Sequence, residues 1–258
     1  MKEFQESAAV IIKHNNPCGA AVSFFGCLAD AYRKARDCDP VSAFGGVVGF
    51  NRVVDRETAE EMIKIFLEVV IAPGFDPKAF EILRTKKDLR ILETLPLNIS
   101  HSQGGLDLRK VVGGLLVQNR DLGKVPIDQW KVVTKRQPTD EEKEAMAFGW
   151  KVAKHVKSNA IVLCREDQTI GIGAGQMSRI DSTHLAVMKA GDAGYCPADS
   201  ILASDAMFPF RDNVDAAAKA KIAAIIQPGG SIRDDEVIAA ADEHNIAMVF
   251  TGMRHFRH

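Results

Sequence analysis

A lysine and a histidine stand side by side at the end of an apolar run, as Lys13 and His14. A histidine has an ordinary pKa of about 6.5 and can accept a proton at neutral pH. A lysine stays charged there and can stabilise a developing oxyanion. Because neighbouring strand residues face opposite ways, the pair shares a site only if the chain turns, and Pro17 and Gly19 favour a turn toward a following helix. The pair indicates either a base with an oxyanion stabiliser, or a surface lysine beside a loop-bound histidine.

Two glycine-rich stretches could let the backbone approach a ligand closely. The first, Ser42 to Gly46, places Phe44 beside two glycines, and a phenylalanine ring can stack on a flat ligand. The second, Gly171 to Gln176, follows a predicted hairpin strand and lacks the spacing of the dinucleotide fingerprint, so we reject a nicotinamide site. The simpler alternative for each stretch is an ordinary loop.

Polar and aromatic side chains are mixed over residues 204–215, a segment too polar for a core loop and too aromatic for a solvated one. Asp212 or Asn213 could instead cap the following helix. The basic end of the chain, residues 254–258, could hold a phosphate, or it could be a frayed terminus.

The elements that must position these residues alternate between helix and strand. Apolar and β-branched runs predict strands at 8–13, 44–50, 68–71, 89–92, 115–118, 131–134, 160–164, 169–172, 222–226 and 246–250. Helical spacing predicts helices at 27–35, 55–66, 76–86, 139–156, 182–190, 214–221 and 234–243, and a capping box begins the fourth of them at Thr139. Residues 94–110 carry few such signals and are predicted to form a loop or connector. The alternation predicts an α/β fold, and a break near 120–138 predicts two subdomains, 1–125 and 126–258.

Composition excludes several classes of function. A net charge of -1 over 258 residues provides no field to attract nucleic acid or an acidic membrane, and no apolar run approaches the roughly 20 residues that span a bilayer. Five cysteines without a C-x-x-C pair favour reduced thiols in a cytoplasm and no metal site. A zinc deaminase needs P-C-x-x-C and H-x-E, but position 21 is Ala21 and the chain has no His-x-Glu.

Taken together, the motifs resemble the AICAR transformylase region of the bifunctional purine biosynthesis enzymes, from about Ala8 to His258. The resemblance rests on their order and spacing along the chain. They are Lys13-His14-x-Asn16-Pro17-Cys18-Gly19, Ser42-Ala-Phe-Gly-Gly46, Ile71-Ala-Pro-Gly74, Lys157-Ser-Asn159, Gly171-x-Gly-x-Gly-Gln176, Ser204-Asp-Ala206, Phe208-Pro-Phe-Arg-Asp-Asn-Val-Asp215 and Arg254-x-Phe256.

The resemblance implies formyl transfer from 10-formyltetrahydrofolate to the 5-amino group of the aminoimidazole carboxamide ribonucleotide, AICAR, on the route to IMP. His14 would be the general base, Lys13 would stabilise the tetrahedral intermediate, and Asn159 would orient the reacting groups. The same resemblance places a further set of residues around the nucleotide and the reduced folate. These are Asn16, Phe44, Gly45, Arg179, Ile180, Phe210, Asp215 and Arg254, with Arg254 on the 5'-phosphate.

The resemblance also implies two cytidine-deaminase-like α/β/α subdomains and a cytoplasmic homodimer whose sites draw on both subunits, with no metal needed for the chemistry. Relative to the family, we expect this chain to lack the IMP cyclohydrolase domain and an upstream Arg-Tyr-Gly-Glu-Asn-Pro-His-Gln segment. The alternative is therefore a non-catalytic fragment that binds nucleotide or folate, or that serves in dimerisation.

Overall fold

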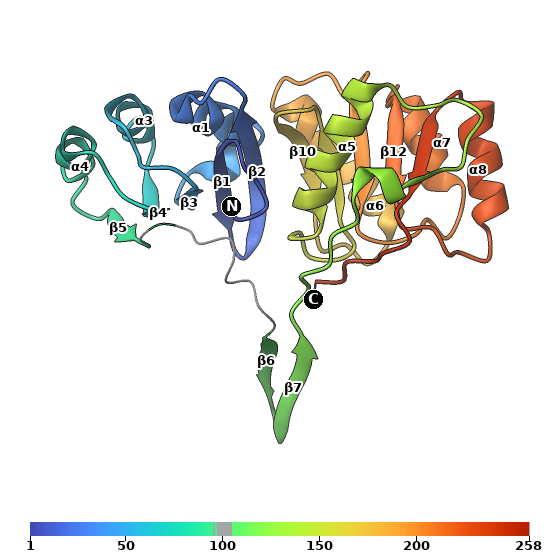
Figure 1. Ribbon diagram of the computed structural model, residues 1–258, viewed down its shortest axis with the longest axis horizontal. Helices are drawn as coiled ribbons and strands as arrows, with labels where there is room; N and C mark the ends of the chain where they lie inside the picture. Colours follow the sequence, from blue (N-terminus) through green and yellow to red (C-terminus); the bar gives the residue numbers. More distant parts are fainter. Residues whose placement is uncertain (95, 97–104, 258) are drawn as a thin grey trace.

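Figure 1 shows the computed structural model, which describes residues 1–94, 96 and 105–257. The first sheet has the strand order β2-β1-β3-β4-β5. Its strand β1 is antiparallel to β2 and β3, whereas β3, β4 and β5 are parallel. The strands are β1 (Ser7–Lys13), β2 (Asn16–Ser23), β3 (Gly46–Phe50), β4 (Leu67–Ala72) and β5 (Arg90–Glu93).

Four helices accompany the first sheet, and Figure 1 shows the three longer ones in a row along it. Tyr32, Met62 and Leu83 come from these three helices and pack into one buried cluster with Ile11, Val48 and Val70 of the strands. The helices are α1 (Leu28–Asp37), α2 (Pro40–Ala43), α3 (Arg56–Met62) and α4 (Pro77–Leu83). Parallel strands joined by helices are the expected product of the alternating pattern.

The second sheet has the order β10-β9-β11-β12-β13-β8. Its strands β11, β12 and β13 are parallel, β9 is antiparallel to β10 and β11, and β8 is antiparallel to β13. The strands are β8 (Lys131–Val132), β9 (Ile161–Cys164), β10 (Thr169–Gly173), β11 (Ile201–Ser204), β12 (Ala224–Gln227) and β13 (Ala247–Phe250).

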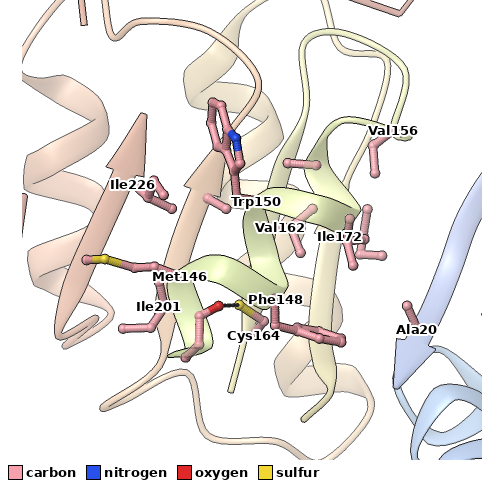
Figure 2. Packing of buried hydrophobic residues seen from close by; sticks show 14 of the residues in the cluster. Ala20, Met146, Phe148, Trp150, Val156, Val162, Cys164, Ile172, Ile201 and Ile226 are labelled. Carbon is pink, nitrogen blue, oxygen red and sulfur yellow. Dashed lines mark hydrogen bonds between the residues drawn. The ribbon is translucent and has the colours of Figure 1, made fainter. Parts of the chain in front are cut away.

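Helices cover both faces of the second sheet. Helix α5 (Asp140–Ala153) packs on one face, where Met146 joins Val162 and Ile201 in a buried cluster (Figure 2). Helices α6 (Arg179–Asp192), α7 (Asp212–Lys219) and α8 (Asp234–Glu243) share a second cluster with the side chains of the opposite face. This part of the chain is therefore an α/β/α sandwich.

The two sheets meet at β2 and the β9–β10 hairpin. The Val22 amide donates to the Asp167 carbonyl (2.8 Å), and the Ala20 amide donates to the Thr169 hydroxyl (3.0 Å). Ala20 also joins the cluster under α5, and Figure 2 shows it pointing there from the first half of the chain. A shared core and shared hydrogen bonds fix the relative position of the sheets.

A ribbon of β6 (Leu106–Val111) and β7 (Gly114–Asn119) connects the halves, followed by the short helix η2 (Ile127–Gln129). Figure 1 shows the ribbon projecting away from both sheets.

The predicted α/β class is confirmed, as is the capping box, in which Thr139 and Glu142 exchange hydrogen bonds of 3.2 and 2.9 Å. The predicted loop at 94–110 is wrong from Leu106 onward, where β6 begins, while its residues 95 and 97–104 lie outside the described residues. Strand β11, four residues long, is not among the strands predicted from the sequence. The subdomain boundary at 125/126 and the cytidine-deaminase-like arrangement stay predictions.

The predicted turn at Pro17 and Gly19 is also wrong, because both residues lie in β2. The chain turns two residues earlier, where His14 (φ 48°) and Asn15 (φ 69°) both have positive φ. Gly19 is needed for packing, since a Cβ there would lie 1.8 Å from the Ala35 carbonyl oxygen of α1. The glycine lets helix and strand approach, and it makes no turn.

Candidate functional site

Lys13 and His14 lie at the tip of the β1–β2 hairpin. Lys13 pairs with Asn16 across a two-residue turn formed by His14 and Asn15, and both central residues have the positive φ typical of such tight hairpins. His14 is exposed at the turn and Lys13 is half-buried. The chain therefore does turn at the pair, as a shared site requires.

Lys13 is held by backbone carbonyls. Its Nζ donates to the carbonyl oxygens of Phe44 (2.9 Å) and Gly45 (3.0 Å). An ammonium has three N–H groups, so these two bonds leave a third for another acceptor. Gly45 has a φ of 67°, and a Cβ there would lie 2.9 Å from Nζ. Only glycine fits this turn without displacing the lysine.

A hollow of about 460 Å³ opens beside this turn. Phe44 and Phe66 line it, with ring centroids 5.5 Å apart, and Phe44 is exposed. Three lysines, Lys64, Lys86 and Lys87, and one acid, Asp88, also line it, so the charge of its rim is positive on balance even though Lys64 pairs with Glu61 (2.7 Å). The arrangement can take a flat ring against the phenylalanines and an anionic group at the rim.

Asn16 ties the hairpin to the segment that carries Asn159. Its side-chain oxygen accepts from the Lys157 amide at 2.9 Å, across 141 residues of sequence. Asn159 in turn donates to the carbonyls of Gln176 (2.9 Å) and Met177 (3.0 Å) and accepts from Arg179 Nη2 (2.8 Å). The amide of Asn159 is therefore fixed on both sides.

Arg179 is the buried anchor of this arrangement. Its Nη1 donates to the Ser204 hydroxyl (2.9 Å) and is paired with the Asp205 carboxylate, which is fully buried. Asp205 Oδ1 also accepts from the Ala160 amide (3.1 Å). We call Asn159, Arg179, Ser204 and Asp205 the Asn159 cluster. No role for Asp205 is predicted from the sequence, where it stands within the Ser204-Asp-Ala206 motif.

The end of the chain docks beside the Asn159 cluster. The His255 amide donates to the Asp205 carbonyl (3.0 Å), and the Ser158 amide donates to the Arg257 carbonyl (2.9 Å). The His255 ring is buried and lies 2.6 Å from the Asp121 carboxylate. Its pKa is lowered, because burial disfavours the charged ring more than Asp121 favours it. Arg254 is exposed, with its guanidinium 4.9 Å from the Phe256 ring centroid.

Phe210 and Asp215 lie elsewhere, at the start of α7. Phe210 is exposed under the Arg233 guanidinium, 4.9 Å from its ring centroid. Asp215 pairs with Arg211 and His244, both at 2.9 Å, and its pKa falls to about 2, mainly through the hydrogen bond from Arg211. Within the described part of the chain, no hydrogen bond or ion pair links either residue to Lys13, Asn16 or Asn159.

The remaining residues of the predicted site take the following places. Ile180 follows Arg179 in the first turn of α6 and is half-buried. Cys18, inside the Lys13 to Gly19 motif, is buried, and desolvation raises the pKa of its thiol to about 12. Cys18 is therefore uncharged at neutral pH and unsuited to act as a nucleophile.

Two further features, a membrane-spanning helix and a metal-holding cluster, are not found among the described residues. No helix there is long and apolar enough to cross a bilayer. No group of three or more histidine, cysteine and acidic side chains is placed to hold a metal ion in residues 1–94, 96 and 105–257.

The chain was compared with known proteins. The family described as the AICARFT/IMPCHase bienzyme matches residues 1–189. The bifunctional purine biosynthesis protein PurH of Magnetococcus marinus is 54% identical over 265 residues, covering 100% of this chain and 50% of that protein. The chain thus spans about half the length of this curated relative. The chain belongs to the AICARFT/IMPCHase bienzyme family.

Proposed function

We propose that this chain carries the formyl-transfer site of its family, which moves the formyl group of 10-formyltetrahydrofolate to the 5-amino group of AICAR. The observation that carries the proposal is the Lys13 ammonium. It is fixed by two carbonyls beside an exposed histidine and keeps one N–H for a ligand.

In the proposed reaction His14 accepts the proton of the amine as its nitrogen attacks the formyl carbon. The amine is conjugated into its ring and is a poor nucleophile, so a base contributes strongly to the rate. Lys13 donates to the oxyanion of the tetrahedral intermediate. His14 then returns a proton to the leaving nitrogen of the folate, which yields the formamide and tetrahydrofolate.

Asn159 serves as the orienting residue in this proposal. Its amide is fixed by Arg179 and by the carbonyls of Gln176 and Met177, so its position does not depend on a ligand. Asn16 joins this segment to the hairpin of Lys13 and His14. An orienting group that is already fixed lowers the cost of assembling the transition state.

The ligands are proposed to lie around the turn of Phe44 and Gly45. The hollow beside Phe44 suits a flat ring, and the lysines of its rim suit an anionic group. Arg254, on a tail docked beside the Asn159 cluster, is proposed to bind the 5'-phosphate. Phe210, just before α7, and Asp215, within α7, lie apart from these residues, which suits the family expectation of a cytoplasmic homodimer with sites built from two subunits.

The proposal is tested by steady-state turnover of the purified chain with 10-formyltetrahydrofolate and AICAR. His14→Ala is expected to lower kcat by about 10² to 10⁴, because a placed acid–base group contributes that much. His184→Ala, an exposed histidine on α6, is the matched control and is expected to leave kcat unchanged. Equal turnover of both variants would contradict the assignment of His14.

Calorimetric titration with each ligand distinguishes the formyl-transfer function from the alternative, a non-catalytic binding fragment. Binding of AICAR and folate without turnover would favour a non-catalytic binding fragment. Absence of both binding and turnover would contradict the proposed site altogether.

A further inference from the structure

The tail that follows β13, residues 251–257, is joined to the body of the chain at two points. The His255 amide donates to the Asp205 carbonyl (3.0 Å), and the Ser158 amide donates to the Arg257 carbonyl (2.9 Å). Asp205 belongs to the Asn159 cluster, and Ser158 directly precedes Asn159 in the chain. The backbone of the tail is therefore fixed relative to that cluster.

Exposure alternates along the tail. Arg254 and Phe256 are exposed, whereas His255 is 2% exposed and is the only buried residue among 252–257. Successive side chains of an extended segment point to opposite sides, so the burial of His255 turns its two neighbours outward. The Arg254 guanidinium lies 4.9 Å from the Phe256 ring centroid, as expected of two side chains on the same side. The direction of Arg254 therefore depends on the burial of His255.

Two different parts of the chain hold the His255 ring. Trp150 of α5, labelled in Figure 2, packs against it with ring centroids 5.0 Å apart. Asp121, in the connector after β7, has a carboxylate oxygen 2.6 Å from Nδ1. Because burial lowers the pKa of the ring, His255 is neutral at neutral pH, and the tautomer that pairs with a carboxylate donates its Nδ1 proton. The ring is thus fixed by packing on one side and by a hydrogen bond on the other.

Arg254 has no such anchor of its own. Within residues 1–94, 96 and 105–257, its side chain makes no hydrogen bond or ion pair to the body and contacts only the Phe256 ring. Chain ends fray unless they are tied down, and the apparent affinity of a site falls with the fraction of molecules in the binding-competent form. The availability of Arg254 to a ligand therefore depends on its neighbour.

We propose that His255 is a positioning residue for Arg254. Its buried ring, held by Trp150 and Asp121, keeps the Arg254 guanidinium beside the Asn159 cluster, where it meets a phosphate group of the substrate. The proposal rests on the proposed function in one respect, the assignment of Arg254 to the 5'-phosphate of AICAR. The docking of the tail through His255 does not depend on that assignment.

The first test measures KM for AICAR at saturating 10-formyltetrahydrofolate. His255→Ala is expected to raise KM at least about tenfold, since loss of a buried hydrogen bond together with its packing shifts an equilibrium by that factor. Its kcat should stay within about threefold of the native value, because the variant weakens binding and leaves the reacting groups in place. His184→Ala, an exposed histidine on α6, is the matched control and is expected to leave KM unchanged.

Asp121→Ala checks the hydrogen bond separately. It should raise KM in the same direction and by less, because the contact between His255 and Trp150 remains. Asp128→Ala removes an exposed acid from the neighbouring helix η2 and is the matched control.

A double-variant cycle with Arg254→Met tests whether His255 acts through Arg254. Arg254→Met removes the guanidinium, so adding His255→Ala to it is expected to raise KM by less than about threefold more. A merely structural contribution of His255 would instead leave the two effects multiplicative.

Limited proteolysis with trypsin tests the docking of the tail without any ligand. Cleavage after Arg254 requires the tail to leave the body, so its rate reports the undocked fraction. His255→Ala is expected to raise this rate at least about tenfold, by the same loss of hydrogen bond and packing. The rate after Lys219, an exposed residue at the end of α7, should not change. Mass spectrometry of the products assigns each cleavage.

The proposal is overturned if His255→Ala is cleaved after Arg254 no faster than the native chain, or if cleavage after Lys219 rises equally. It is also overturned if Arg254→Met raises KM for AICAR and His255→Ala does not, or if the two effects multiply in the double variant. A native chain that neither binds nor turns over AICAR would contradict the proposed function instead, and proteolysis would then decide whether His255 positions the tail.

Discussion

Two cations of the candidate site, Lys13 and Arg179, are held in opposite ways. Arg179 is 6% exposed, and its charge is matched by the fully buried carboxylate of Asp205. Lys13 is half-buried, and its ammonium is held by the carbonyls of Phe44 and Gly45, which carry no formal charge. The charge of Arg179 is therefore neutralised by a buried partner, whereas the charge of Lys13 is fixed in position but not neutralised.

The contrast indicates which cation acts on a ligand. Carbonyls can orient an ammonium without cancelling its field, so Lys13 is preorganised for an anion that develops nearby. A buried ion pair that loses one partner leaves an uncompensated charge, so Arg179 is needed for stability. Asn159 connects the two, because Arg179 fixes its amide.

The largest effect is expected from Arg179→Met, which leaves Asp205 buried without its cation. The free energy of unfolding should fall by about 3–5 kcal/mol in urea denaturation. The double variant Arg179→Met/Asp205→Leu removes both charges and should recover most of this loss. If the single and double variants are equally unstable, the ion pair is not what Arg179 contributes.

A smaller effect is expected from Gly45→Ala. Positive φ costs an alanine roughly 1–2 kcal/mol, and the new Cβ would also lie 2.9 Å from Lys13 Nζ. Both the free energy of unfolding and turnover should therefore decrease.

Gly26→Ala is the matched control for that change. Gly26 has a φ of 77°, but nothing lies within 4 Å of the position that a Cβ would take. An alanine there would therefore lose stability only through its positive φ and would displace no side chain. An equal loss of turnover in both variants would show that displacement of Lys13 is not the cause.

The smallest effect concerns Asp215, whose ion pair with Arg211 is exposed, unlike that of Arg179. Its folded pKa of about 2 lies below the ordinary value of 3.8, so its contribution is present above about pH 4 and lost as pH falls toward 2. Since both side chains are more than a third exposed, solvent screening limits it to below about 1 kcal/mol.

Unfolding free energy measured between pH 6 and pH 2 for the native chain and Asp215→Asn checks this prediction. The variant should lose less stability on acidification, and 1 M salt should narrow the difference. A native chain that gains stability toward pH 2 relative to the variant would reverse the expected sign.

The local pattern of residues is sufficient to predict most of the helices and strands. The apolar runs of β1, β9 and β13 and the capping box of α5 are encoded by neighbouring residues. The hairpin at His14 was missed because Gly19 resembles a turn residue, while its function is a contact with Ala35 on another element. A contact between two elements produces no periodic pattern in the sequence, so it cannot be predicted from neighbouring residues.

The sequence supplied candidate residues for the site but not their arrangement. Lys13, His14, Phe44 and the basic tail with Arg254 were singled out from their chemistry, and the roles of the other residues came from the family resemblance. The link from Lys13 to the Phe44 carbonyl and that from Asn16 to Lys157 span 31 and 141 residues. The ion pair between Arg179 and Asp205 likewise depends on the close approach of two elements. Only the folded chain reveals such pairs.

The most direct test of the contrast compares Lys13→Met and Arg179→Met in the same preparation, by turnover and by urea denaturation. The account predicts that Lys13→Met lowers kcat by about 10² to 10³ and unfolding free energy by less than about 1 kcal/mol. Arg179→Met should instead lower the free energy of unfolding by about 3–5 kcal/mol. Unchanged turnover in Lys13→Met, or a stability loss equal to that of Arg179→Met, would contradict the account.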